Sequence, residues 1–84
     1  MNMPLKTRII LPINSQTYYG SSISVGNLEK GSKLFIGRHN RVEEMIVEEV
    51  KFDENLNSYE IHTDKAILLA YPQTRISYSL NYKS

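Results

Sequence analysis

The amino-acid sequence predicts an all-β fold, and three observations lead to that prediction. Short apolar segments recur along the 84 residues, several of them alternate apolar with polar residues, and turn-forming residues separate them. The segments follow one another roughly every 8 to 12 residues, a spacing typical of small barrels and sandwiches. We therefore expect a five- or six-stranded SH3-like barrel or sandwich, formed as a single small β domain over residues 1–84.

The N-terminal half supplies the first predicted strands. Residues 5–13 form one strand, and the polar stretch 14–22 follows it. Gly31 marks a turn ahead of an apolar strand at residues 34–36. The polar residues 37–41 form the next turn and lead into a segment whose structure is harder to assign.

That segment, residues 41–51, fits a helix in one respect. Asn40 with Glu43 forms a capping box, and valine and isoleucine recur at a spacing of four. In such a helix, however, Glu49 falls within the apolar stripe. An α+β fold with a helix over residues 41–51 is therefore the alternative prediction.

The same segment fits a strand better. It is rich in β-branched residues, which favour strands. A β-bulge at Glu48-Glu49 adds one residue to the strand and so restores a single apolar face. That face would hold Val47, Val50 and Phe52.

The C-terminal half gives the clearest strand signals. Residues 59–63 and 66–70 are of strand length, and residues 64–65 between them suit a tight turn, so they predict a hairpin. The turn-forming residues 53–58 join this hairpin to the preceding segment. Residues 75–82 alternate apolar and polar side chains and predict the last strand.

Composition and charge predict where in the cell the protein is found and which partners its charge would not attract. Ten basic and nine acidic side chains give a net charge of +1, so no long-range attraction to nucleic acid is expected. The N-terminal apolar stretch is too short for a signal peptide, and no apolar run approaches the roughly 20 residues of a membrane span. With no cysteine in the chain, we expect a cytoplasmic, intracellular protein without a membrane partner.

The sequence offers little for catalysis. It lacks the nucleophile-elbow, zinc-protease, Walker and dinucleotide-binding patterns. His39 and His62 are the only histidines, and His39 could join Glu43 and Glu44 around a metal only if a helix began there. We therefore expect no enzyme activity, no catalytic residues, no metal site and no cofactor.

Two clusters are candidates for binding. One is a polar, basic turn whose donors suit phosphates or bases, extended upstream by two lysines. The other is a pair of adjacent tyrosines in a polar loop, where packing alone explains them poorly and where they can stack on bases. The candidate residues are Arg38, His39, Asn40 and Arg41, with Lys30 and Lys33, and Tyr18 and Tyr19.

Two functions follow from these clusters. The first is a non-enzymatic protein-binding module whose partner is another protein or a second copy of the chain in a homodimer. Plentiful Asn, Lys, Ile and Tyr are typical of AT-rich coding sequence and favour a phage-encoded modulator or inhibitor of a host protein. The alternative is a small-barrel nucleic-acid-binding protein that uses the basic turn and the loop tyrosines. Near-neutral charge favours the first.

Overall fold

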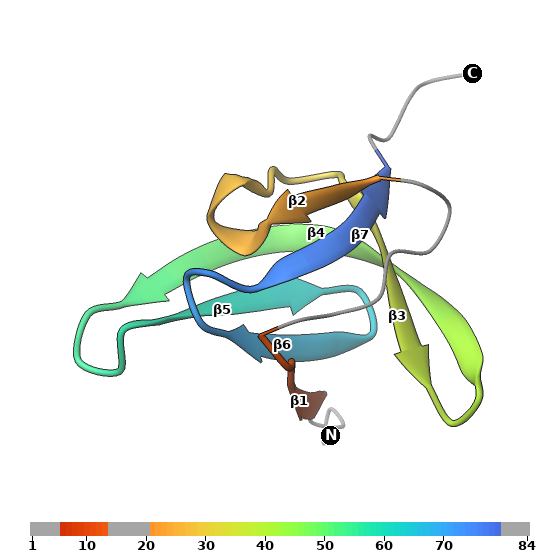
Figure 1. The fold of residues 1–84 in the computed structure, drawn as a ribbon, viewed down its shortest axis with the longest axis horizontal. Coiled ribbons are helices and arrows are strands. Elements are labelled where there is room, and N and C mark those ends of the chain that lie inside the picture. The colour runs from red at the N-terminus through yellow and green to blue at the C-terminus, as the bar shows by residue number, and fades with distance from the viewer. Residues whose placement is uncertain (1–5, 14–20, 80–84) are drawn as a thin grey trace, which may run out of the picture.

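Seven strands form one mixed sheet in the computed structural model, which describes residues 6–13 and 21–79. Their order across the sheet is β1-β6-β5-β4-β3-β7-β2 (Figure 1). The pairs are antiparallel except for β1 with β6, which is parallel. The elements are β1 (Thr7–Ile10), β2 (Ser22–Ser24), the 3-10 turn η1 (Val25–Asn27), β3 (Lys33–Arg38), β4 (Arg41–Asp53), β5 (Ser58–Thr63), β6 (Ala66–Ala70) and β7 (Arg75–Ser79).

The predicted all-β class is confirmed, and the finer expectation is corrected. The sheet has seven strands rather than five or six. It is not closed into a barrel, because the two outermost strands in its order, β1 and β2, do not pair with each other within the described residues. The added strand is β2, which the sequence did not predict. The strand β1 lies within the predicted residues 5–13, but its parallel pairing with β6 was not predicted.

The alternative helix over residues 41–51 is wrong, because this segment is the 13-residue strand β4. Its register against β5 shifts between Val47 and Glu49, which confirms the expected bulge. Val47 is buried on the core side, and Val50 packs against the core from the same side. Phe52 continues this face to the edge of the core, where its ring centroid lies 4.9 Å from that of Tyr59.

The bulge divides β4 between two halves of the sheet. Up to Ile46 it pairs with β3, and from Val47 onward it pairs with β5. At the division, the Val47 backbone donates to Ser32 O at 2.9 Å and accepts from Gly31 N at 2.8 Å. Gly31 has φ 94°, a left-handed conformation that glycine adopts without steric cost.

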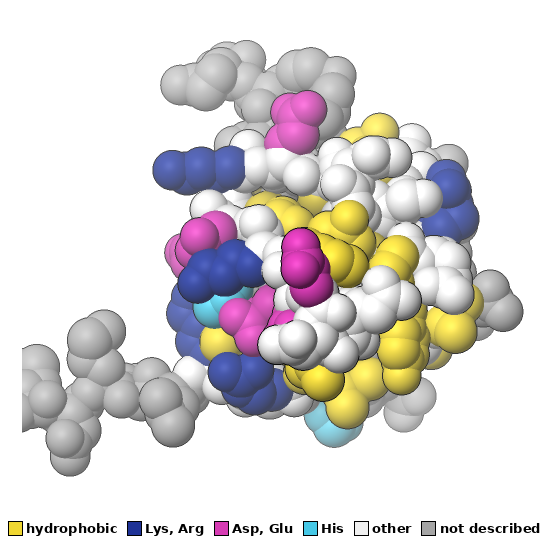
Figure 2. All heavy atoms as spheres, turned by 90° about the vertical axis from the view of Figure 1, so that its left-hand side faces the viewer, with side chains coloured by type: hydrophobic (Ala, Val, Ile, Leu, Met, Phe, Trp, Pro, Cys, Tyr) yellow, Lys and Arg dark blue, Asp and Glu magenta, His cyan; other side chains and the backbone are white. Residues whose placement is uncertain are grey.

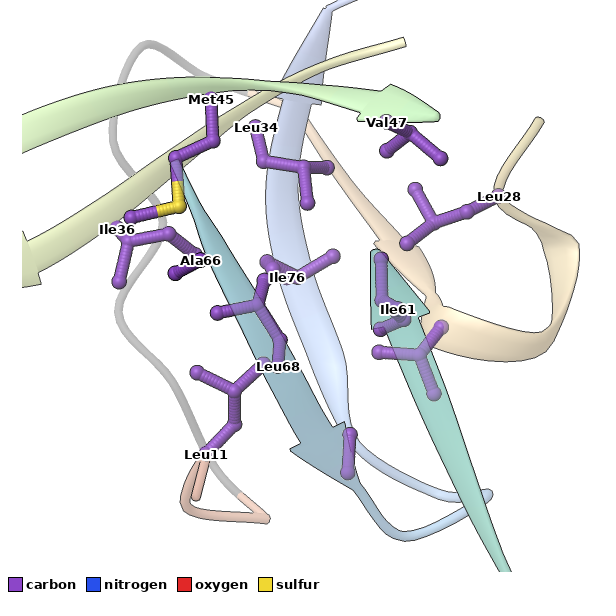
Figure 3. Packing of buried hydrophobic residues seen from close by; sticks show 12 residues of the cluster. Leu11, Leu28, Leu34, Ile36, Met45, Val47, Ile61, Ala66, Leu68 and Ile76 are labelled. Carbon is purple, nitrogen blue, oxygen red and sulfur yellow. The ribbon is translucent and has the colours of Figure 1, made fainter. Parts of the chain in front are cut away.

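The hydrophobic core fills the space between the two halves. Figure 3 shows Leu34 and Met45 of one half pointing into the same space as Ile61 and Leu68 of the other. Burial of these side chains is the main favourable term in folding a chain of this size. The complete cluster is Leu11, Val25, Leu28, Leu34, Ile36, Met45, Val47, Ile61, Ala66, Leu68, Ala70 and Ile76.

The predicted C-terminal hairpin is confirmed as β5 and β6, and its turn is held by a buried threonine. Thr63 Oγ1 donates to Ala66 O at 2.7 Å and accepts from Ala66 N at 2.9 Å and Lys65 N at 3.2 Å. The adjacent Asp64 ties this turn to β4, since its backbone N–H donates to Ile46 O at 3.0 Å and its Oδ1 accepts from Ile46 N at 2.9 Å.

The remaining predicted elements agree in place and differ in extent. Residues 5–13 contain the four-residue β1, and residues 34–36 lie within the longer β3. The last predicted strand, residues 75–82, is β7 as far as Ser79, and its final part lies outside the described residues.

Replacing Thr63 with valine tests the role of the buried hydroxyl. Thr63→Val keeps the side-chain volume but leaves Ala66 and Lys65 N–H without this acceptor, so we expect the free energy of unfolding to fall by about 1–3 kcal/mol. Urea denaturation followed by circular dichroism measures the change. Thr7→Val, at an exposed position of β1, is the matched control and should stay within about 0.5 kcal/mol of the parent. Equal stability of both variants would contradict the assigned role.

Candidate docking surface

One outer face of the sheet combines charged and apolar side chains. It belongs to β1, β6, β5 and the second half of β4, and its residues follow from the strand register. The first row across these strands holds Arg8, Ile67, His62 and Glu49, and the second holds Ile10, Leu69, Glu60 and Lys51.

Beyond the second row lies an apolar hollow of about 210 Å³. Ile10, which is 75% exposed, lines it from the edge strand β1, and Leu56, which is 69% exposed, lines it from the β4–β5 turn. The complete lining is Ile10, Leu56, Ser58, Leu69, Ala70 and Tyr71.

The described residues expose five large hydrophobic side chains, and most of them lie at this hollow. Three of the five line the hollow, whereas Phe52 lies on the core side of the sheet against Tyr59. Figure 2 looks onto this end and shows hydrophobic side chains at its centre and right, with most of the charged ones at the left and an acidic one near the centre. The five residues are Ile10, Ile13, Phe52, Leu56 and Tyr71.

The charged side of this face is internally paired. Glu60 Oε2 accepts from Arg8 Nη1 at 3.3 Å, and Glu60 Oε1 lies 2.7 Å from His62 Nε2. The hydrogen bond from His62, aided by Arg8, lowers the pKa of Glu60, although partial burial acts in the opposite direction. Lys51 lies 3.9 Å from Glu49 in the same region. Cations on this face therefore have carboxylate neighbours.

The predicted basic turn lies elsewhere, at the tip of the β3–β4 hairpin. His39 and Asn40 form its two-residue loop, with φ of 51° and 65°, the left-handed values that a type I′ turn requires at both central positions. Arg38 and Arg41 are register partners on either side of the loop. The side chains of His39, Asn40 and Arg41 are exposed.

The two predicted lysines do not join that turn. Lys33 begins β3 and Arg38 ends it, which separates their Cα atoms by about 17 Å. Lys33 lies 3.4 Å from Glu44, and Lys30 is exposed three residues before it. The other predicted pair, Tyr18 and Tyr19, lies outside the described residues.

Neither a metal site nor a histidine pair forms among the described residues. No three of their histidine and carboxylate side chains come together around a common point. His39 lies at the tip of the β3–β4 hairpin, next to Arg41 at the start of β4. His62 is the register partner of Glu49, which lies eight residues, or about 26 Å of strand, beyond Arg41. Within residues 6–13 and 21–79, no helix has the length and apolarity to cross a membrane.

No protein-family model, curated protein or solved structure matches the chain. The functional inference therefore depends on the apolar hollow and its surroundings.

The sequence-based candidates did not include the residues of the apolar hollow. Ile10 and Leu69 are register partners on neighbouring strands, but they lie 59 positions apart in the sequence, so no local pattern brings them together. One signal was present at Leu56, a large apolar residue in the otherwise polar turn of residues 53–58. A leucine at the tip of a polar hairpin turn has no core to enter and is therefore a surface feature.

The Glu60 interactions predict a pH-dependent contribution to stability. The pKa of Glu60 is lowered in the folded state, so its carboxylate stabilises the fold at pH values above its ordinary pKa of 4.5. This stabilisation is lost as the pH falls through the lowered pKa. Glu60→Gln should therefore reduce the free energy of unfolding at pH 7 by less than about 1 kcal/mol, and the difference should vanish in strong acid.

Urea titrations of both proteins across this pH range measure the difference. Glu29→Gln is the control, because Glu29 is exposed and has no ion pair in the described part of the chain. A Glu60→Gln difference that persists in strong acid would contradict the assignment.

Proposed function

We propose that the protein is a non-enzymatic protein-binding module that docks its partner on the apolar hollow. The observation that carries the proposal is that three of the five exposed large hydrophobic side chains of the described residues, Ile10, Leu56 and Tyr71, line one hollow. Contiguous exposed apolar surface on a small protein typically marks an interaction site, because leaving it in water is unfavourable.

The size of the hollow favours a protein partner over a small ligand. At about 210 Å³ it is smaller than the roughly 300–1,000 Å³ of sites that enclose a drug-sized ligand or cofactor. Anchoring side chains in protein interfaces fill shallow pockets of this kind, and they carry most of the binding energy. A cytoplasmic, phage-encoded modulator or inhibitor of a host protein is the biological role that we infer for such a module.

We also infer that the architecture is an opened variant of the small SH3-like barrel or sandwich. In this variant the two halves of the bent sheet face each other across the core, while β1 remains at an edge. The edge position of β1 leaves Ile10 beside the hollow and 75% exposed.

Nucleic-acid binding by the β3–β4 hairpin is the second candidate function. A specific observation favours it: the backbone register places an arginine at both positions that flank the two-residue loop, 38 and 41. His39 also adopts a left-handed conformation that is costly for a residue other than glycine. The net charge of +1 and the acidic residues Glu43 and Glu44 on the same hairpin place this function second.

Substitution of Leu56 tests the proposed docking surface. Because Leu56 is exposed in a turn, Leu56→Ser should leave the free energy of unfolding within about 0.5 kcal/mol of the parent. Loss of an anchoring side chain should weaken partner binding by at least about tenfold.

A photo-crosslinking residue at position 56 identifies the partner for this measurement in cells. The same residue at position 30, which is exposed away from the hollow, is the control. Protein adducts are expected from position 56 and not from position 30. Adducts from position 30 alone, or full partner affinity in the Leu56→Ser variant, would contradict the proposal.

A further inference from the structure

The charges around the apolar hollow are not balanced, although the whole chain is nearly neutral. The basic side chains closest to it in register, Arg8 and Lys51, have carboxylate neighbours, Glu60 at 3.3 Å and Glu49 at 3.9 Å. Their charges are therefore largely compensated within the molecule.

Two carboxylates on the rim are not compensated in this way. Asp53 is the register partner of Ser58, which lines the hollow, and Glu54 lies two residues before Leu56. Both side chains are exposed, and neither has an ion pair among the residues that the structure describes. We call Asp53 and Glu54 the acidic rim.

The acidic rim and the apolar wall are parts of one turn. Asp53 Oδ1 accepts hydrogen bonds from the backbone of Asn55 at 2.9 Å and Leu56 at 3.2 Å. These bonds form a local turn in which the aspartate side chain fixes the backbone that follows it. The turn therefore presents the Asp53 carboxylate and the Leu56 side chain together.

We propose that the apolar hollow receives a large apolar side chain from a partner segment in which lysine or arginine flanks that side chain. The inference rests on the proposed docking function and adds the chemistry of the partner. The apolar anchor fills the hollow, and the flanking cations lie over the acidic rim. Such charge complementarity speeds association and selects among partners more than it adds affinity.

Three fluorescently labelled eight-residue peptides test the inference by fluorescence anisotropy. In the first, Phe-Leu is flanked on each side by two lysines and a terminal glycine. Glutamates replace the lysines in the second, and serines replace Phe and Leu in the third. At low salt the lysine peptide should bind at least about tenfold more tightly than either other peptide, and physiological salt should reduce that advantage, because exposed charges are screened.

Variants of the protein connect the binding to the acidic rim. Glu54→Lys should weaken binding of the lysine peptide about fivefold at low salt and strengthen binding of the glutamate peptide, because a rim charge is reversed. Glu29→Lys changes the net charge equally at an exposed position outside the hollow and is the matched control. Leu56→Ser should abolish binding of the lysine peptide.

The outcomes separate this inference from the docking function itself. If the glutamate peptide binds as tightly as the lysine peptide and Leu56→Ser abolishes both, the basic partner is excluded and the docking function stands. If no peptide binds, and light scattering shows a dimer that Leu56→Ser dissociates, the occupant is a second copy and the inference is overturned. Lysine-peptide binding that Glu29→Lys weakens as much as Glu54→Lys does would show a non-specific charge effect and would also overturn it.

Discussion

The extra residue in β4 is the constraint on which the rest of the structure depends. A straight 13-residue strand would span about 40 Å, more than the molecule's longest dimension of 37 Å, so one face of it could not stay buried in the core. The bulge at Glu48 bends and twists the strand, so the first half of β4 pairs with β3 in one half of the sheet and the second half pairs with β5 in the other. Lys6 supports this position, since its Nζ lies 3.0 Å from Glu48 Oε1 and also donates to the backbone oxygen of Thr63.

The bend also determines where the docking surface lies. Past the bulge, β4 continues with β5 beyond the core as a projecting hairpin, visible at the left of Figure 1. Its turn carries Leu56 and the acidic rim to the carboxyl ends of β1 and β6, which meet at the same end because these strands are parallel. The proposed site is therefore assembled from three separate parts of the chain, and the position of each depends on the fold of β4.

Local sequence patterns predicted the parts of this fold that depend on neighbouring residues. The β5–β6 hairpin, the turn before it and the bulge in β4 all follow from alternation and turn chemistry over short stretches. The parallel pairing of β1 with β6 and the three-residue β2 could not be predicted this way, because long-range register determines them. For the same reason the basic turn was the visible candidate, whereas the apolar hollow, which needs Ile10 beside Leu69, was not.

Deletion of Glu48 tests the central role of the bulge most directly. The deletion leaves Val47, Glu49, Val50 and Lys51 in strict alternation, so the apolar face of β4 is preserved and only the extra residue is lost. Glu48→Ala keeps the bulge and loses only the exposed ion pair with Lys6, which contributes less than about 1 kcal/mol. Two-dimensional amide NMR and urea denaturation of both variants give the answer. We predict dispersed resonances and cooperative unfolding for Glu48→Ala, and loss of both for the deletion. A deletion variant that folds with the parent's stability would contradict the account.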